Sequence, residues 1–153
     1  LYKMEKQLED QIKQTFMKAM QDFLSKSISE KLTDHDIEWL VSLCKELKDR
    51  INNLTPSRHD LHIQLNGSID TDLIKQMLFN DAFDDNDVNH IVDCIFERLK
   101  MLCAPSQDKE ISALQLKISN MKNFGEKISC LIMECNKIVD AIELLKQNFE
   151  KGK

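Results

Sequence analysis

The most obvious candidate for chemistry is an acidic run in the middle of the chain. The run Asp85–Asn89 reads Asp-Asn-Asp-Val-Asn, which matches the first half of an EF-hand calcium loop. The match then ends, because His90 stands where the loop needs Gly for its sharp turn and Phe96 stands where it needs a bidentate Glu. Aspartates ahead of an apolar periodic stretch also favour the positive end of a helix. We therefore interpret the run as helix capping and predict no calcium site.

Two pairs of side chains have the spacing that places metal ligands on one face of a helix. His59 and His62 are about one helical turn apart, and His90 and Cys94 have i, i+4 spacing. Four such ligands hold zinc only if the two helices meet at that point, and neither pair has a compact ligand motif around it. Solvent-facing or hydrogen-bonded histidines are the simpler interpretation. We predict no metal and no cofactor.

The cysteines lack the surroundings of a paired or reactive thiol. Their number is odd, and each sits among apolar positions with helical spacing, which is typical of buried thiols in a reducing compartment. Cys103 stands at a predicted helix end, where the carbonyl groups raise the pKa of a thiol and do not activate it. We expect packed, unreactive thiols and a cytoplasmic location. The five are Cys44, Cys94, Cys103, Cys130 and Cys135.

The sequence lacks the motifs of the common catalytic sites. With 3 Gly and 2 Pro in 153 residues, it has no glycine-rich loop to cradle a phosphate. The sequence also contains no Gly-x-Ser-x-Gly, no dinucleotide fingerprint and no His-Glu-x-x-His. We predict that the protein is not an enzyme and has no catalytic residue.

Charge and hydropathy exclude two further classes of partner. The net charge is −5, with 18 Lys and 3 Arg, so the clustered cations that neutralise nucleic-acid phosphates are missing. The longest apolar runs are a few residues, which is too short for a membrane span. Because the chain begins with Leu1, we expect it to be a trimmed form or a fragment.

Hydrophobic periodicity predicts helices along the whole chain. The scarcity of Gly and Pro argues against a turn-rich β fold, so we expect an all-α protein, a single helical domain over residues 1–153 with six or seven helices and a long C-terminal one. In the fourth of these helices, Leu73, Ile74, Met77 and Leu78 should face inward. The predicted helices cover 4–24, 34–54 (capped by Asp34), 55–65 (capped by Thr55, with Pro56 first and Asn66-Gly67 after its end), 70–78, 88–102 (ended by Pro105), 106–121 (capped by Ser106) and 128–149.

The last predicted helix carries apolar residues spaced 3, 4, 3, 4, 3, 4, which amounts to three heptads. Such a seam fits either a coiled coil with another chain or the long helix of an intramolecular bundle. Ile132 and Val139 widen the stripe, which favours the bundle. The stripe consists of Ile128, Leu131, Cys135, Ile138, Ile142, Leu145 and Phe149.

Several short motifs resemble the T-complex protein 11 family. Pro56-x-Arg58 with Leu61, the segment Ile69–Gln76 and the segment Ala82–Asp84 are similar to the family's approach to its core. Leu102–Pro105, followed by Asp108 and Glu110-Ile111, resembles the family motif Cys-Ala-Pro followed by Arg-Asp-x-Glu, with Gln107 in place of the Arg. The family-like region extends over about 23–149 and is clearest at 56–111.

The resemblance implies a helical, non-enzymatic protein linked to the regulation of cyclic AMP and protein kinase A signalling. It also suggests an interaction module that binds a protein partner, as a monomer or a homodimer. In structural terms, the carboxylates after Pro105 should cap the amides of the next helix. The residues that the resemblance suggests for protein binding are Arg58, Asp70, Asp72, Gln76, Gln107, Asp108 and Glu110.

Two alternatives stay open at this point. The first is a structural protein that self-assembles through a coiled coil of its final heptads. The second is a helical groove-binder similar to apoptosis regulators, although Trp39 lacks the neighbours of the Asn-Trp-Gly-Arg signature found in those proteins.

Overall fold

The computed structural model describes residues 3–8, 11, 14, 15, 18, 33–122 and 124–151. All regular structure within these residues is helical, so the predicted all-α bundle with a long C-terminal helix is confirmed. The helix predicted over 4–24 falls mostly outside the described residues. From residue 33 onward the elements are α2 (Asp34–Asn53), α3 (His59–Ser68), α4 (Thr71–Phe79), α5 (Asp85–Leu102), the 3₁₀ turn η1 (Pro105–Gln107), α6 (Asp108–Ser119) and α7 (Phe124–Lys151).

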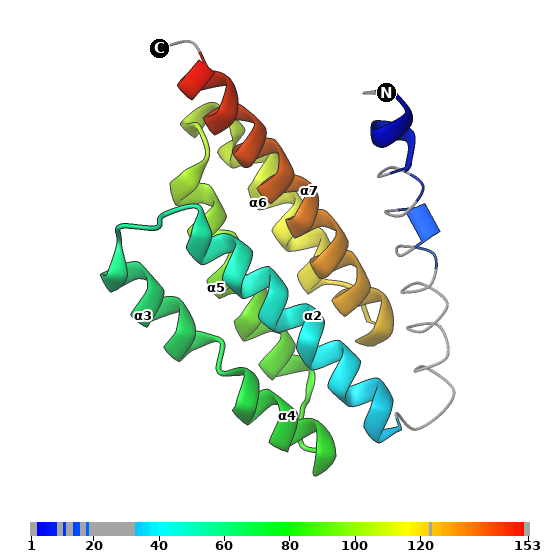
Figure 1. Cartoon of the computed structure of the whole chain (residues 1–153). Helices are drawn as coiled ribbons and strands as arrows, with labels where there is room; N and C mark the ends of the chain where they lie inside the picture. The colour runs from blue at the N-terminus through cyan, green and yellow to red at the C-terminus, as the bar shows by residue number, and fades with distance from the viewer. Residues whose placement is uncertain are drawn as a thin grey trace.

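Two helices, α2 and α5, lie in the middle of the bundle (Figure 1). The shorter α3 and α4 follow one another along one side, where α3 contacts both central helices and α4 contacts α2. The antiparallel pair α6 and α7 covers the other side, and α7 packs on α2, α5 and α6. None of the helices in the described part of the chain is long and apolar enough to cross a membrane.

The core is a single cluster of aliphatic side chains with one phenyl ring. The central helices supply its most deeply buried members, and α7 supplies the largest share from the outer layers. On α7 these side chains follow the predicted 3–4 spacing, widened by Ile132 and Val139 as expected. Members that are fully or almost fully buried are Leu40, Leu47, Ile51, Leu65, Ile69, Val88, Val92, Phe96, Leu99, Ile118, Ile132, Cys135 and Val139.

Helix capping accounts for the acidic run, as predicted. Asp84 is the N-cap of α5: its carboxylate accepts from the amide of Asp87, and the Asp87 carboxylate accepts from the amide of Asp84, both at 3.0 Å. Asp70 caps α4 in the same way, accepting from the amide of Leu73 at 3.2 Å. At α2 the cap is Thr33, one residue before the predicted Asp34, because its hydroxyl forms the capping box with Asp36.

Three local predictions between α2 and α4 are wrong. The amide of Arg58 donates to the carbonyl of Thr55 at 3.1 Å, which closes a turn around Pro56, and α3 begins only at His59. Proline presets a backbone angle that suits the second position of a turn as well as the start of a helix. Gly67 lies inside α3 without a positive φ, so it does not end that helix. Leu73 is exposed, whereas its neighbour Ile74 faces the core as predicted.

The end of α4 is closed by an aspartate. Asp81 has φ 57°, a left-handed conformation that Asp tolerates better than most residues. The amide of Asp81 donates to the Leu78 carbonyl at 3.3 Å, and that of Ala82 donates to the Met77 carbonyl at 2.8 Å. This is the Schellman pattern.

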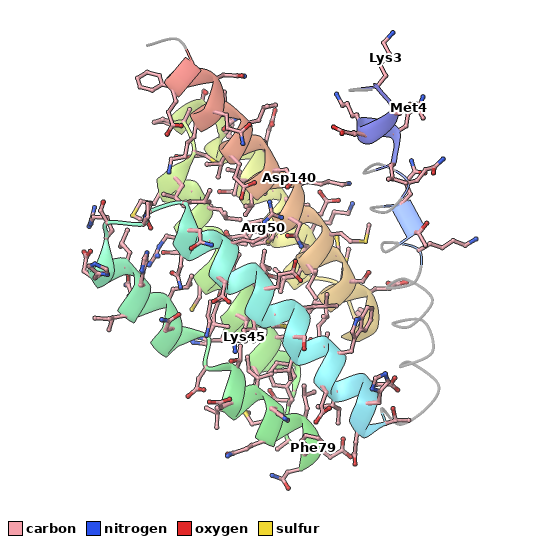
Figure 2. All side chains as sticks on the ribbon, viewed as in Figure 1. Lys3, Met4, Lys45, Arg50, Phe79 and Asp140 are labelled. Carbon is pink, nitrogen blue, oxygen red and sulfur yellow. The ribbon has the colours of Figure 1, made fainter. Side chains whose placement is uncertain are left out.

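Two cationic side chains, Arg50 and Lys127, bond to polar groups on a neighbouring helix and so fix the position of α7 in the bundle. Arg50 of α2 donates to Asn136 and Asp140 at 2.6 Å and to Glu143 at 3.1 Å, and Figure 2 shows Arg50 and Asp140 between α2 and α7. In the first turns of α7, Lys127 is fully buried, and its ammonium group donates to Asp85 at 2.6 Å and Asn89 at 2.9 Å. These bonds satisfy a charge that would be costly to bury alone.

The Lys127 contact predicts a measurable coupling. Asp85→Ala is expected to lower the free energy of unfolding by about 1–3 kcal/mol, because the buried ammonium group would keep only Asn89 as a partner. In a Lys127→Met background the same change should cost only the helix-dipole contribution, about 0.3–1 kcal/mol. Urea unfolding of the four proteins measures the difference. Equal costs in the two backgrounds would show that the contact does not stabilise the fold.

Candidate protein-binding groove

The Cys-Ala-Pro motif forms a sharp joint between α5 and α6. The amide of Cys103 donates to the Leu99 carbonyl at 3.0 Å and ends α5, as Pro105 predicts. Pro105 then starts the 3₁₀ turn, in which the amide of Gln107 donates to the Ala104 carbonyl at 2.9 Å. Because this turn runs directly into α6, its backbone supplies the bonds that a capping side chain would otherwise make.

The predicted side-chain caps at this joint are therefore wrong. Neither η1 nor α6 has a side-chain cap, so Ser106 does not begin the helix with its hydroxyl. Asp108 and Glu110 lie in the first turn of α6, where carboxylates favour the helix dipole, and both are exposed.

Beside this joint, the apolar stripe of α7 passes from buried to exposed. Ile142 is 8% exposed and belongs to the core, whereas Leu145 is 64% exposed and Phe149 is 69% exposed. The three residues continue the same 3–4 spacing. The sequence pattern alone assigned all of them to one buried face. It did not indicate that the side chains after Ile142 are exposed to solvent.

The joint and the exposed end of α7 enclose a groove of about 680 Å³, which we call the motif groove. Its walls are mostly apolar, and it is large enough for several side chains of a partner. The lining residues come from the end of α5, from η1, from α6 and from α7: Leu102, Cys103, Ala104, Ser106, Gln107, Glu110, Ile111, Leu114, Ile138, Ala141, Ile142, Leu145, Lys146, Phe149 and Glu150.

Charges of both signs stand along the motif groove. Glu110 of α6 and Glu150 of α7 contribute carboxylates, and Lys146 contributes an ammonium group. The Lys146 ammonium also donates to the carbonyl of Leu54, the C-cap residue of α2. This bond satisfies one of the free carbonyls at that helix end and positions the lysine stem against the bundle.

The thiol in the motif groove is poorly suited to nucleophilic chemistry. Partial burial raises the pKa of Cys103, and the carboxylate of Asp108 raises it further. A raised pKa leaves little thiolate at neutral pH, and the thiolate is the reactive form. Cys103 therefore acts as a half-buried apolar wall of the groove, in agreement with the sequence.

The structure brings together only part of the predicted binding set. Gln107 and Glu110 line the motif groove, and Asp108 lies next to them in the first turn of α6. None of the remaining four lines this groove. Arg58 forms a bidentate pair with Asp60 at 2.9–3.0 Å, Asp70 is a helix cap, and Asp72 and Gln76 are exposed on α4.

The pairs considered for zinc have other contacts. His62 bonds to the Thr55 carbonyl at 2.7 Å, and the His90 ring lies 3.7 Å from the Cys94 sulfur. His59 packs edge-on against His62, with ring centroids 5.8 Å apart. Across the described residues, no three His, Cys, Asp or Glu side chains are grouped so that they could hold a metal ion.

Arg98 is a buried cation that lines a second, smaller hollow, and its hydrogen bonds join two helices. Its guanidinium group donates to the Leu61 carbonyl at 3.2 Å and to the Gln64 side chain at 2.9 Å. Burial lowers the pKa of Arg98 from its ordinary value. These bonds hold α3 against α5, and a hollow of about 310 Å³ lies beside them.

Exposure along α7 predicts two different mutational outcomes. Ile142→Ala is expected to lower the free energy of unfolding by about 2–4 kcal/mol, because it leaves a cavity in the core. Leu145→Ala should lower it by less than about 1 kcal/mol, because most of that side chain is already in water. Chemical unfolding of both variants checks the contrast. Similar losses at the two positions would mean that the core extends past Ile142.

Comparison with known proteins connects this chain to one family. The model of the T-complex protein 11 family matches residues 1–151, which includes the motif and all of the helices described above. The human T-complex protein 11 homolog is 28% identical over 109 residues, which is 71% of this chain and 21% of the homolog. No solved structure matches the chain.

Two further human relatives give the same result. T-complex protein 11-like X-linked proteins 1 and 2 are each 30% identical over 103 residues, covering 65% of this chain and 20% of each relative. The chain thus spans about a fifth of the length of the curated relatives that it matches. Since the family model covers almost every residue, the chain belongs to the T-complex protein 11 family.

Proposed function

We propose that this chain is a non-catalytic protein-interaction module and that it binds through the motif groove. The observation that carries the proposal is the exposed end of α7 beside the family motif. Leu145 is 64% exposed although its spacing continues a core stripe, and it lines a groove of about 680 Å³. Apolar side chains gathered in this way are typical of surfaces that bind another protein.

The polar side chains support a protein partner over a small metabolite. Glu110, Lys146 and Glu150 stand along an open, mostly apolar surface, which resembles the apolar centre and polar rim of a protein interface. The poorly ionised thiol of Cys103 supplies no nucleophile for a bound substrate.

The pathway is part of the proposal, and the resemblance to the family supports it. We place the module in the regulation of cyclic AMP and protein kinase A signalling, in the cytoplasm. The five cysteines are free, as expected of a protein that works in a reducing compartment.

Neighbouring leucines on α7 provide a matched test. Leu144 and Leu145 are 59% and 64% exposed, but only Leu145 lines the motif groove. We expect Leu145→Asp to weaken binding to purified protein kinase A subunits by tenfold or more, about 1.4 kcal/mol, because a carboxylate would be buried against apolar side chains. Leu144→Asp should change the affinity by less than about twofold. Isothermal titration calorimetry with the regulatory and the catalytic subunit measures both.

The outcomes separate the parts of the proposal. If neither subunit binds, the kinase pathway is wrong. If a subunit binds and both aspartate variants bind as well as the original chain, the motif groove is not the binding surface. Matching melting temperatures of the variants exclude unfolding as the cause.

A further inference from the structure

We propose that Thr55, in the turn between α2 and α3, is a phosphorylation site for a proline-directed protein kinase, and that Lys146 of α7 binds the added phosphate. The inference goes beyond the proposed function, because it assigns a covalent modification and does not depend on what the motif groove binds. A phosphate held in this way ties the last turns of α7 to the turn before α3.

Thr55-Pro56 is the only step in the sequence at which a proline follows a serine or a threonine. Proline has no amide hydrogen. A kinase that offers no acceptor at the position after the modified residue therefore selects proline there, because any other residue would leave a buried amide without a bond. Pro56 gives this turn the feature that such a kinase recognises.

The hydroxyl group of Thr55 is available for modification. Thr55 is half-buried, and its neighbours Pro56 and Ser57 are exposed. The hydroxyl donates to the carbonyl of Asn52 at 3.5 Å, a bond so long that little is lost when a phosphate replaces the hydrogen. The turn is closed by the bond from the Arg58 amide to the Thr55 carbonyl at 3.1 Å, so it can open for a kinase while the bodies of α2 and α3 stay folded.

A lysine and a histidine contact the backbone on either side of the Thr55 side chain. The Lys146 ammonium donates to the carbonyl of Leu54, which belongs to the peptide bond that joins Leu54 to Thr55. The His62 ring bonds to the carbonyl of Thr55 itself at 2.7 Å. Because an ammonium group has three donors, Lys146 can bind a phosphate on Thr55 and keep its bond to Leu54.

The end of α2 sets the opposing effect. Leu54 is the C-cap of this helix, and the free carbonyls at a helix C-terminus disfavour a negative charge on Thr55. The Lys146 ammonium lies at the same helix end and has the opposite charge. Bonds between an ammonium and a phosphate are roughly twice as strong as neutral hydrogen bonds, whereas salt screens the effect of the helix end. The attraction to Lys146 therefore prevails.

The modification is a phosphoryl transfer from ATP. The hydroxyl oxygen of Thr55 attacks the γ-phosphorus, the bond from that phosphorus to the bridging oxygen of the β-phosphate breaks, and ADP leaves. A carboxylate of the kinase takes the hydroxyl proton. The product carries a charge of about −1.5 to −2 at pH 7 where the hydroxyl was neutral.

Phosphorylation of the intact chain tests the site. The chain is incubated with Mg-ATP and a purified mitogen-activated or cyclin-dependent kinase, both of which are proline-directed, and mass spectrometry of peptides locates the phosphate. We expect phosphate on Thr55. In Pro56→Ala the rate of modification at Thr55 should fall at least about tenfold, because the new amide has no acceptor in the kinase. Ser57→Ala is the matched control and should be modified as fast as the original chain.

Melting temperatures of the phosphorylated and unmodified forms test the role of Lys146. Phosphorylation should raise the melting temperature of the original chain by at least about 2 °C. In Lys146→Met it should leave the melting temperature unchanged or lower it, because the ammonium group is missing. Lys137→Met removes an exposed ammonium group elsewhere on α7, so the rise should persist in this control.

Each half of the inference has a result that would overturn it. The site is wrong if neither kinase modifies Thr55, or if Pro56→Ala is modified as fast as the original chain. The role of Lys146 is wrong if phosphorylation does not raise the melting temperature of the original chain, or if the rise persists in Lys146→Met.

Discussion

The apolar stripe of α7 is the contact on which the remaining structure depends. Six of its side chains are at most 8% exposed, and they pack against α2, α5 and α6 at once. Because burial of this kind is the main favourable term in folding, the packing of the bundle requires α7 to lie along the central pair. The six are Ile128, Leu131, Ile132, Cys135, Val139 and Ile142.

Apolar packing alone leaves the position of a helix along its axis poorly defined, and polar contacts on α7 remove that freedom. Lys127 binds Asp85 near its beginning, and Arg50 binds Asp140 and Glu143 further along. A shift of α7 by one turn would leave the buried Lys127 without its partners, at a cost of several kcal/mol. The ion pairs thus fix where the core stripe ends and where the exposed turns begin.

The exposed turns of α7 lie beside the joint between α5 and α6. α7 has 28 residues and is about 42 Å long, whereas its antiparallel neighbour α6 has 12 residues and is about 18 Å long. The motif at Cys103–Pro105 ends α5 and leads into α6 beside the last turns of α7, and both line the motif groove. The same joint therefore contributes to the core and leaves the motif groove beside it.

Local signals in the sequence predicted the helices better than the groove. The helix end at Pro105, the capping of α5 by the acidic run and the 3–4 spacing of α7 each reflect interactions within a few residues, and each was confirmed. Thr55-Pro56 failed because a turn and a helix start share the same local chemistry. The burial of Lys127 and the exposure of Leu145 depend on residues far away in the sequence, so periodicity gave no warning of either.

Hydrogen exchange along α7 tests the central claim that one helix serves both the core and the binding surface. The account predicts that, in dilute protein, amides at 131–142 exchange only through global unfolding. Amides at 145–150 should exchange at least about a hundredfold faster, because these turns lie outside the core. Uniform protection along the whole of α7 in dilute protein would contradict the account, since the last turns would then belong to the folded core.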